Sequence, residues 1–222
     1  RNNENSSCAV RHQGETVFRE VDQPFFGLHR TRRTGARTFD VWSLRKKNYL
    51  VGETVTLSMN NCRETAGAFF SESSDLAVAQ VTVNYLHGFG WLTQMCRDVS
   101  FTGVHFHPDP QHHVSSFADC IHVCGCKGTV TVKDCSFTQA HDDAINIHGA
   151  FLRFVRRVDD HTAVFQFVHR QQGGYRAFFP GDTVRFYYRS SLQPCGEENT
   201  VAAAEDDIDT KICTLTFDRP LP

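Results

Sequence analysis

The chain has 222 residues, which is enough for one large domain or two small ones. Its 23 lysines and arginines are balanced by 25 aspartates and glutamates, a net charge of -2, which argues against a nucleic-acid-binding or anionic-membrane surface. No stretch approaches the ~20 apolar residues of a membrane-spanning helix.

The ends of the chain indicate a piece of a longer protein. It begins at Arg1 without a methionine, ends on TFDRPLP, and shows no signal peptide. Residues 1–50 are polar and basic with scattered aromatic residues. We expect them to lead into the first coils of the fold described next.

Residues 51–150 are rich in alternating strands bounded by turn residues. The strand patterns are TVTLSMNNC (54–62), LAVAQVTV (76–83), VSFTGVHF (99–106) and TVTVKDCSF (129–137). The last three align at three apolar positions, with steps of 23 and 31 residues, the longer step containing the insertion HPDPQHHVSS. The matched sets are Val78, Phe101 and Val132; Val81, Val104 and Cys135; and Val83, Phe106 and Phe137.

A second series of short strands repeats in the same order. It aligns on Gly67, Gly90, Asp119 and Asp143. Two positions later the residues are large and apolar, so this position is predicted to point inward: Phe69, Leu92, Ile121 and Ile145. The alternate positions are then predicted to point outward. They include Trp91, Cys120 and Ala144, then Thr93, His122 and Asn146, then Met95, Cys124 and His148.

Two strand series that repeat every 20 to 30 residues predict stacked coils. The chain lacks the leucine and asparagine frame of a leucine-rich repeat, and a β-sandwich, the alternative, does not explain matched inward columns. We therefore predict an all-β fold with a right-handed parallel β-helix over residues 51–150. Residues 151–222 lose the coil period and are predicted to form an inserted or second small β domain of antiparallel, barrel-like character, in which the acidic segment 194–210 is a loop or hairpin tip.

The stretch HDDAINIHG (141–149) places two adjacent acids at the start of a strand. Asp119 occupies the position of Asp143 on the preceding coil, and strands in register lie ~4.8 Å apart. The coils therefore bring Asp119, Asp142 and Asp143 together. Clustered carboxylates can supply an acid and a base for glycoside hydrolysis. Calcium binding and simple capping of turns remain as alternatives.

Nine cysteines, an odd number, match neither a disulfide framework nor a zinc module. The stretch CIHVCGC (120–126) falls within a strand pattern rather than in paired knuckles. We expect its thiols to lie in or against the core.

The segment FADCIHVCGCKGTVTVKDCSFTQAHDDAINIHG (117–149), followed by FQFVHRQQGGYRAFFPGDTVRFYYRSSLQP (165–194), resembles glycoside hydrolase family 110. CRETAGAFFSES (62–73) and NYLHGFG (84–90) belong to the same resemblance. The family consists of considerably longer bacterial exo-α-1,3-galactosidases that invert the anomeric centre. The resemblance implies a parallel β-helix with barrel-like elements, a substrate with a terminal α-1,3-linked galactose such as blood group B or linear Galα1-3Gal, and no metal or organic cofactor. It also implies a secreted, periplasmic or cell-surface location.

By motif and spacing, the three acids of the family fall on Asp119, Asp142 and Asp143. Asp119 and Asp143 share a column, so together they can hold one water and act as the general base. This leaves Asp142 as the general acid. The predicted outward face offers an aromatic ring and polar groups for galactose: Trp91, His122, Asn146 and His148. His87 and His141 are weaker candidates for this role. Four further histidines lie in or near the insertion and are expected either to wall the cleft or to form a plain polar loop: His105, His107, His112 and His113.

Two other functions remain open. A polygalacturonase-like hydrolase or lyase would need cations for uronate groups, but no basic cluster accompanies the acids. A truncated, non-catalytic carbohydrate-binding β-helix would keep the fold without turnover. The oligomeric state and the preference for branched or linear galactosides do not follow from the sequence.

Overall fold

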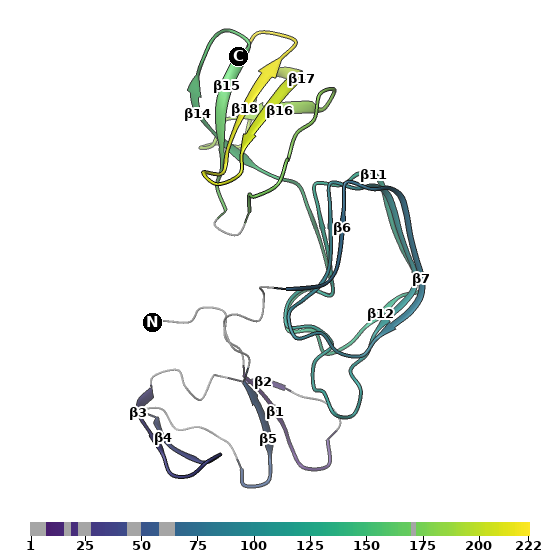
Figure 1. Cartoon of the computed structure of the whole chain (residues 1–222), viewed down its shortest axis with the longest axis vertical. Helices are drawn as coiled ribbons and strands as arrows, with labels where there is room; N and C mark the ends of the chain where they lie inside the picture. The colour runs from purple at the N-terminus through teal and green to yellow at the C-terminus, as the bar shows by residue number, and fades with distance from the viewer. Residues whose placement is uncertain (1–7, 16–18, 22–27, 44–49, 58–64, 170–171) are drawn as a thin grey trace. The chain divides into compact units, whose positions relative to one another are not determined.

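The structure is a computed structural model that describes residues 8–15, 19–21, 28–43, 50–57, 65–169 and 172–222. Every regular element within these ranges is a β-strand, so the all-β prediction is confirmed. The chain forms two compact units, Arg1–Ile147 and His148–Pro222 (Figure 1). Among the described residues, no helix of the length and apolarity needed to cross a membrane is present.

The N-terminal strands form antiparallel sheets. β1 (Cys8–Arg11) pairs with β2 (Arg19–Val21) and with β5 (Thr54–Leu57), and β3 (Leu28–Arg33) forms a hairpin with β4 (Phe39–Ser43). The alternating pattern at 54–57 was grouped with the coil strands, but β5 pairs antiparallel with β1 and takes no part in the parallel sheets. The remainder of that pattern, 58–62, lies outside the described residues.

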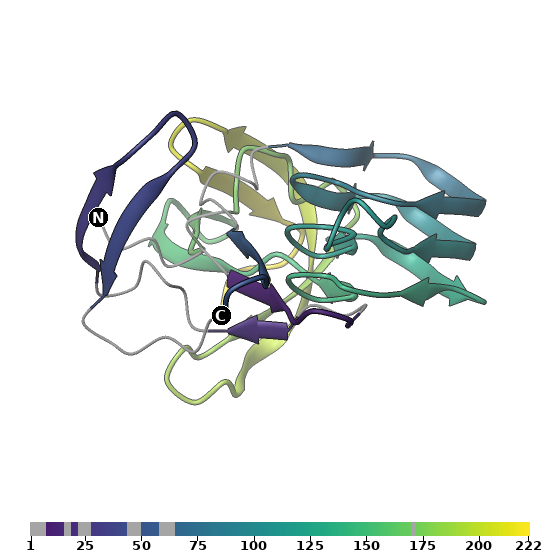
Figure 2. The ribbon, with the colours of Figure 1, turned by 90° about the horizontal axis from the view of Figure 1, so that it is seen from below.

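From residue 66 the chain alternates between two parallel sheets. The first sheet contains β6 (Ala66–Ser71), β8 (Phe89–Gln94), β10 (Ile121–Cys124) and β13 (Ile145–His148). In the second, β9 (Arg97–Phe106) pairs with β7 (Ser74–Val83), β11 (Lys127–Lys133) and β12 (Ser136–Phe137), in each case in parallel. Figure 2 shows these strands stacked coil upon coil. The predicted stack of coils is therefore present.

The inward columns of the second sheet agree with the prediction. Val78 and Val132 both pair with Phe101, and Val83 and Phe137 both pair with Phe106. Phe101 and Phe106 are fully buried. Each fully buried side chain of this size contributes roughly 1.5–3 kcal/mol, so this column is a main source of stability.

Left-handed backbone conformations recur at equivalent corners of successive coils. The bend after the first-sheet strand falls at Glu72, Met95 and Gly125, with φ of 49°, 52° and 64°. The bend at the start of the second sheet falls at Asp75, Asp98 and Gly128, with φ of 55°, 53° and 69°. The left-handed region is readily open to glycine and less costly for aspartate than for most residues. These positions let the chain turn from one sheet to the other in the same way in each coil.

The register of the first sheet differs from the prediction by one residue. Trp91 pairs with Ala68 on one side and Ile121 on the other, and Leu92 pairs with Phe69 and His122. The backbone bonds from Cys120 N–H to Asp143 O and from Ile121 N–H to Ala144 O repeat the pattern one coil later. The inner column of this sheet is thus Ala68, Trp91, Ile121 and Ile145. The outer row, as we call it from here on, is Phe69, Leu92, His122 and Asn146.

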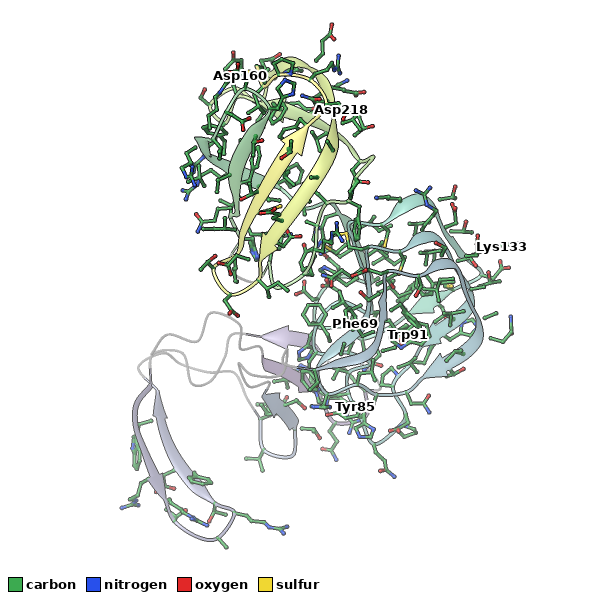
Figure 3. All side chains as sticks on the ribbon, turned by 45° about the horizontal axis from the view of Figure 1, so that its top comes forward. Phe69, Tyr85, Trp91, Lys133, Asp160 and Asp218 are labelled. Atoms are coloured by element: carbon green, nitrogen blue, oxygen red, sulfur yellow. The ribbon has the colours of Figure 1, made fainter. Side chains whose placement is uncertain are left out.

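The shift of one residue exchanges the two faces of β6 and β8. Phe69 was predicted to point inward but is 58% exposed, and Leu92 lies on the outside with it. Trp91, labelled with Phe69 in Figure 3, was predicted to point outward but is only 7% exposed. Its ring packs against Phe101. Thr93, also predicted outward, is fully buried. The inward prediction for Ile121 is confirmed, since it is fully buried.

The second unit is an antiparallel sheet. Its order is β14 (Leu152–Arg157), β15 (Thr162–Phe167), β18 (Ile212–Phe217), β17 (Pro194–Asp207) and β16 (Thr183–Tyr187). The sheet packs around a core that includes Phe165, Val201, Leu215 and Phe217. Residues 194–207, predicted as part of a loop, form the long strand β17, in which alternate residues such as Val201 are buried. The predicted hairpin tip is the turn at 208–211, between β17 and β18.

Candidate active site

The three acids lie at the starts of two neighbouring parallel strands. Asp119 precedes β10, and Asp142 and Asp143 precede β13. Because the coils are in register, Asp119 stands opposite Asp143, and carboxylate oxygens of all three lie within 4.8 Å of one another. The structure therefore brings together the three acids that the sequence grouped.

The surroundings of the acids differ. Asp119 is 3% exposed, whereas Asp142 and Asp143 are exposed. One buried carboxylate beside two accessible ones gives the cluster an inner member that is fixed in place and two outer members that solvent or a ligand can reach.

Asp119 is held by groups from its own strand and from the next. Nδ1 of His122 lies 2.5 Å from Oδ2 of Asp119, and Asn146 and the backbone N–H of Asp143 also donate hydrogen bonds to this carboxylate. Burial raises the pKa of Asp119, but the hydrogen bond and charge of His122, with the bonds from Asn146 and Asp143, outweigh burial and hold the pKa below its usual range. Asp119 is thus an ionised, oriented carboxylate at neutral pH.

His122 and Asn146 lie on the outside of the first parallel sheet, as predicted. They are neighbours in the outer row, and both contact Asp119 from that side. The carboxylate of Asp119 therefore faces the outer surface although its residue stands at the edge of the core.

Trp91 does not belong to the outer surface. Its indole packs between Phe70, Phe101 and Phe106, with ring centroids 6.3, 6.0 and 5.3 Å away. The prediction that its ring faces a sugar is therefore wrong, because the corrected register turns it toward the core.

His148 is the last residue of β13. Its Nδ1 lies 2.8 Å from the carbonyl oxygen of Gly149 and 3.4 Å from Nε2 of Gln172. A role for His148 in substrate binding stays a prediction.

Four of the six weaker histidine candidates form two separate groups, whereas His87 contacts Thr65 and His112 contacts Asp109. His105 and His107 both contact the hydroxyl of Ser136, at 2.7 and 2.8 Å, on the second parallel sheet. His113 and His141 flank the ring of Phe117, at centroid distances of 6.0 and 4.9 Å. The second group lies on the loops that lead into the acids, and burial together with the charges of His141, His112 and Arg11 lowers the pKa of His113 to about 4.

Two phenylalanines beside the site escaped the sequence reasoning. Phe89 meets the imidazole of His122 edge to face, with ring centroids 5.4 Å apart at 87°. Phe69 lies in the outer row itself. The sequence could have revealed both residues if β8 had been shifted by one residue relative to β10. In that register Phe89 stands level with Asp119, and Phe69 stands on the same face as His122.

Among the described residues, the three acids are the one group of three or more metal-binding side chains close enough to share an ion. Carboxylate oxygens suit a hard cation such as Ca²⁺, which takes 6–8 oxygen ligands. The cysteines described as free thiols are Cys96, Cys120, Cys124, Cys126, Cys135, Cys195 and Cys213. Burial raises the pKa of Cys120 to about 11, as expected for a thiol that lies in the core.

Comparison with known proteins gives a consistent result over most of the chain. An α-1,3-galactosidase B of Bacteroides fragilis (strain YCH46) is 34% identical over 158 residues, which is 69% of this chain and 26% of that protein. An α-1,3-galactosidase A of Bacteroides fragilis (strain ATCC 25285) is 32% identical over 176 residues, 77% of this chain and 28% of its own length. An α-1,3-galactosidase A of Streptomyces avermitilis is 34% identical over 169 residues, 72% of this chain and 27% of its own.

A domain family described as GLAA-B beta-barrel domain II matches residues 162–222, which lie within the second unit. These relatives are glycosidases by name, and the chain spans about a quarter of their length. The chain belongs to the α-1,3-galactosidase family, glycoside hydrolase family 110.

Proposed function

We propose that the full-length protein is an inverting exo-glycosidase that removes terminal α-1,3-linked galactose, for example from blood group B or linear Galα1-3Gal ends. The observation that carries this proposal is the cluster of Asp119, Asp142 and Asp143, in which one acid is buried and oriented and two are exposed. The relatives are named α-1,3-galactosidases, which supports the proposal that the bond cleaved is an α-1,3-galactosidic bond.

In the proposed mechanism, Asp119 and Asp143 hold one water between them, because they stand opposite each other on neighbouring strands. Asp119 is suited to the role of base, since His122 keeps its pKa low. Asp142 lies beside this pair and protonates the leaving oxygen. His122 and Asn146 orient Asp119 from the outer face of the first sheet, the face on which we propose that galactose binds.

The separation of the acids does not by itself favour inversion. Carboxylate oxygens within 4.8 Å of one another are closer than the ~6.5–9.5 Å typical of an acid and base in inverting enzymes and nearer the ~5 Å of retaining ones. We propose inversion because retention needs only two carboxylates, whereas the pairing of Asp119 with Asp143 leaves a third acid for the leaving group. The family resemblance points the same way.

We further propose that the coils of residues 66–148 are part of a right-handed parallel β-helix that continues in the full-length protein. The alternation between two parallel sheets supports this architecture. We also propose a secreted, periplasmic or cell-surface location, because the proposed substrates are glycans at cell surfaces. Fractionation of the source cells would test the location.

The function is tested by incubating the full-length protein with Galα1-3Gal, Galα1-4Gal and polygalacturonate, and measuring released sugar. Galactose from the α-1,3 disaccharide alone is expected, with no loss of rate after treatment with EDTA. Cleavage of polygalacturonate would instead support a polysaccharide hydrolase or lyase. Binding without release of galactose would support a non-catalytic module, and a rate abolished by EDTA and restored by Ca²⁺ would assign the acids to a cation.

A further inference from the structure

An apolar extension continues the outer row beyond the polar residues that hold Asp119. Leu92 on β8 stands opposite His122, and Phe69 on β6 stands opposite Leu92. Adjacent strands lie ~4.8 Å apart, so the backbone of Phe69 is ~10 Å from that of His122 along the stacking direction of the coils. The row therefore reaches an aromatic side chain two strands away from His122.

Phe69 is exposed, whereas the residue that follows it is packed against the core. Its side chain is 58% exposed, whereas Phe70, the next residue, packs against the core. A single exposed apolar residue is ordinary on a protein surface. Phe69 differs because it shares one face and one row with Leu92 and with both side chains that bind the buried acid.

The acids and the apolar residues of the row follow one another in the order of the two sugars of a disaccharide, the galactose first and the sugar of the leaving group next. Asp142 and Asp143 precede β13, Asp119 precedes β10, and Leu92 and Phe69 follow on β8 and β6. A galactose placed against the acids at β10 and β13 leaves the next sugar over β8 and β6. Pyranose rings have an apolar face of C–H groups, which packs on aromatic and aliphatic side chains. The outer row holds no lysine or arginine, and its histidine is already paired with Asp119, so the row suits a neutral sugar rather than a uronate.

We propose that Phe69 and Leu92 form the surface that binds the sugar on the leaving-group side of the cleaved bond, a neutral hexose whose apolar face packs on the phenyl ring. The inference rests on the proposed glycosidase function and adds the residues that select the aglycone. Phe69 is a binding residue and touches none of the reacting atoms.

The test compares two substrates of the full-length protein. In α-galactosyl fluoride the leaving group is a single atom that cannot reach Phe69, whereas Galα1-3Gal carries a second ring. Phe69→Ala is expected to lower kcat/KM for the disaccharide about 3- to 10-fold, mostly through KM, and to change the rate with the fluoride less than twofold. Phe69→Tyr, which keeps the ring, is expected to restore the disaccharide rate.

Phe154→Ala is the matched control, because Phe154 is a similarly exposed phenylalanine, at 53%, on β14 of the second unit. It is expected to leave both rates unchanged. An unchanged disaccharide rate in Phe69→Ala, or an equal loss with both substrates, would overturn the proposed aglycone surface while leaving the glycosidase intact. A wild-type protein that cleaves neither substrate would overturn the proposed function, and this inference with it.

Discussion

The imidazole Nδ1 of His122 lies 2.5 Å from Oδ2 of Asp119, and this contact joins an outward side chain to a carboxylate that is almost completely buried. A hydrogen bond to an ionised carboxylate is among the strongest in proteins. It fixes the orientation of Asp119 and favours its ionised form.

Removing this contact is expected to impair the proposed base. In His122→Ala, the pKa of Asp119 should rise, because burial then acts with less opposition. We expect kcat to fall about 10- to 100-fold, as for loss of a charged hydrogen bond, and the acidic limb of the pH profile to move to higher pH. His105→Ala, on the second sheet, serves as the control with an unchanged profile. A full-rate His122→Ala enzyme with an unmoved acidic limb would contradict the role.

Asp142→Asn is expected to abolish most turnover without affecting the fold. The side chain is exposed and the change is nearly isosteric, so the melting temperature should change no more than it does for an ordinary surface substitution. Loss of a general acid costs about 10²- to 10⁴-fold in rate, and less with leaving groups that need no proton. In this variant the rate with Galα1-3Gal should therefore fall much more than the rate with α-galactosyl fluoride. Near wild-type cleavage of the disaccharide would exclude Asp142 as the acid.

The corrected register predicts that two aromatic substitutions in the first sheet differ widely in how much they lower the free energy of unfolding. Trp91→Ala empties a core position and is expected to cost about 3–5 kcal/mol. Phe69→Ala removes an exposed ring and should change the free energy of unfolding by about 0.5 kcal/mol or less. Urea unfolding of the two variants measures both values. The reverse order would show that the faces are assigned wrongly.

His113 predicts a loss of stability in mild acid. Burial, with the charges of His141, His112 and Arg11, lowers the pKa of His113 to about 4 in the folded protein, whereas an unfolded histidine titrates near ~6.5. Between these values the unfolded state binds the additional proton, so stability falls as the pH drops from about 6.5 to 4. His113→Gln should lose less stability between pH 7 and pH 5 than wild type. Equal losses in the two proteins would remove His113 as the cause.

The second parallel sheet could be predicted from the sequence because its strands are long and their apolar columns unambiguous. Val78, Phe101 and Val132 identify the register in any alignment of the three strands. The first sheet offers fewer such anchors, since its strands have only four to six residues. Matching Gly90 to Asp119 gave a step of 29, whereas the pairing of Trp91 with Ile121 makes it 30.

The acids were accessible to sequence reasoning for a related reason. Asp119 and Asp143 are spaced by one coil of 24 residues without an insertion, so their stacking did not depend on the slipped step. The burial of Asp119 and its bond to His122 depend on how the chain turns at the corner before β10, which alternation does not describe. Trp91 was misplaced because a large ring on a sheet fits either a sugar or the core, and only the neighbouring Ala68 reveals the space it fills.

The anomer released first from Galα1-3Gal tests the central claim most directly, since it depends on both the cleaved bond and the roles of the three acids. If Asp119 and Asp143 activate a water, attack comes from the face opposite the leaving group and no covalent galactosyl-enzyme forms. Proton NMR of the full-length protein with this disaccharide should show β-galactose in the first minutes, before mutarotation. An initial α-galactose signal, or no released galactose, would contradict the account.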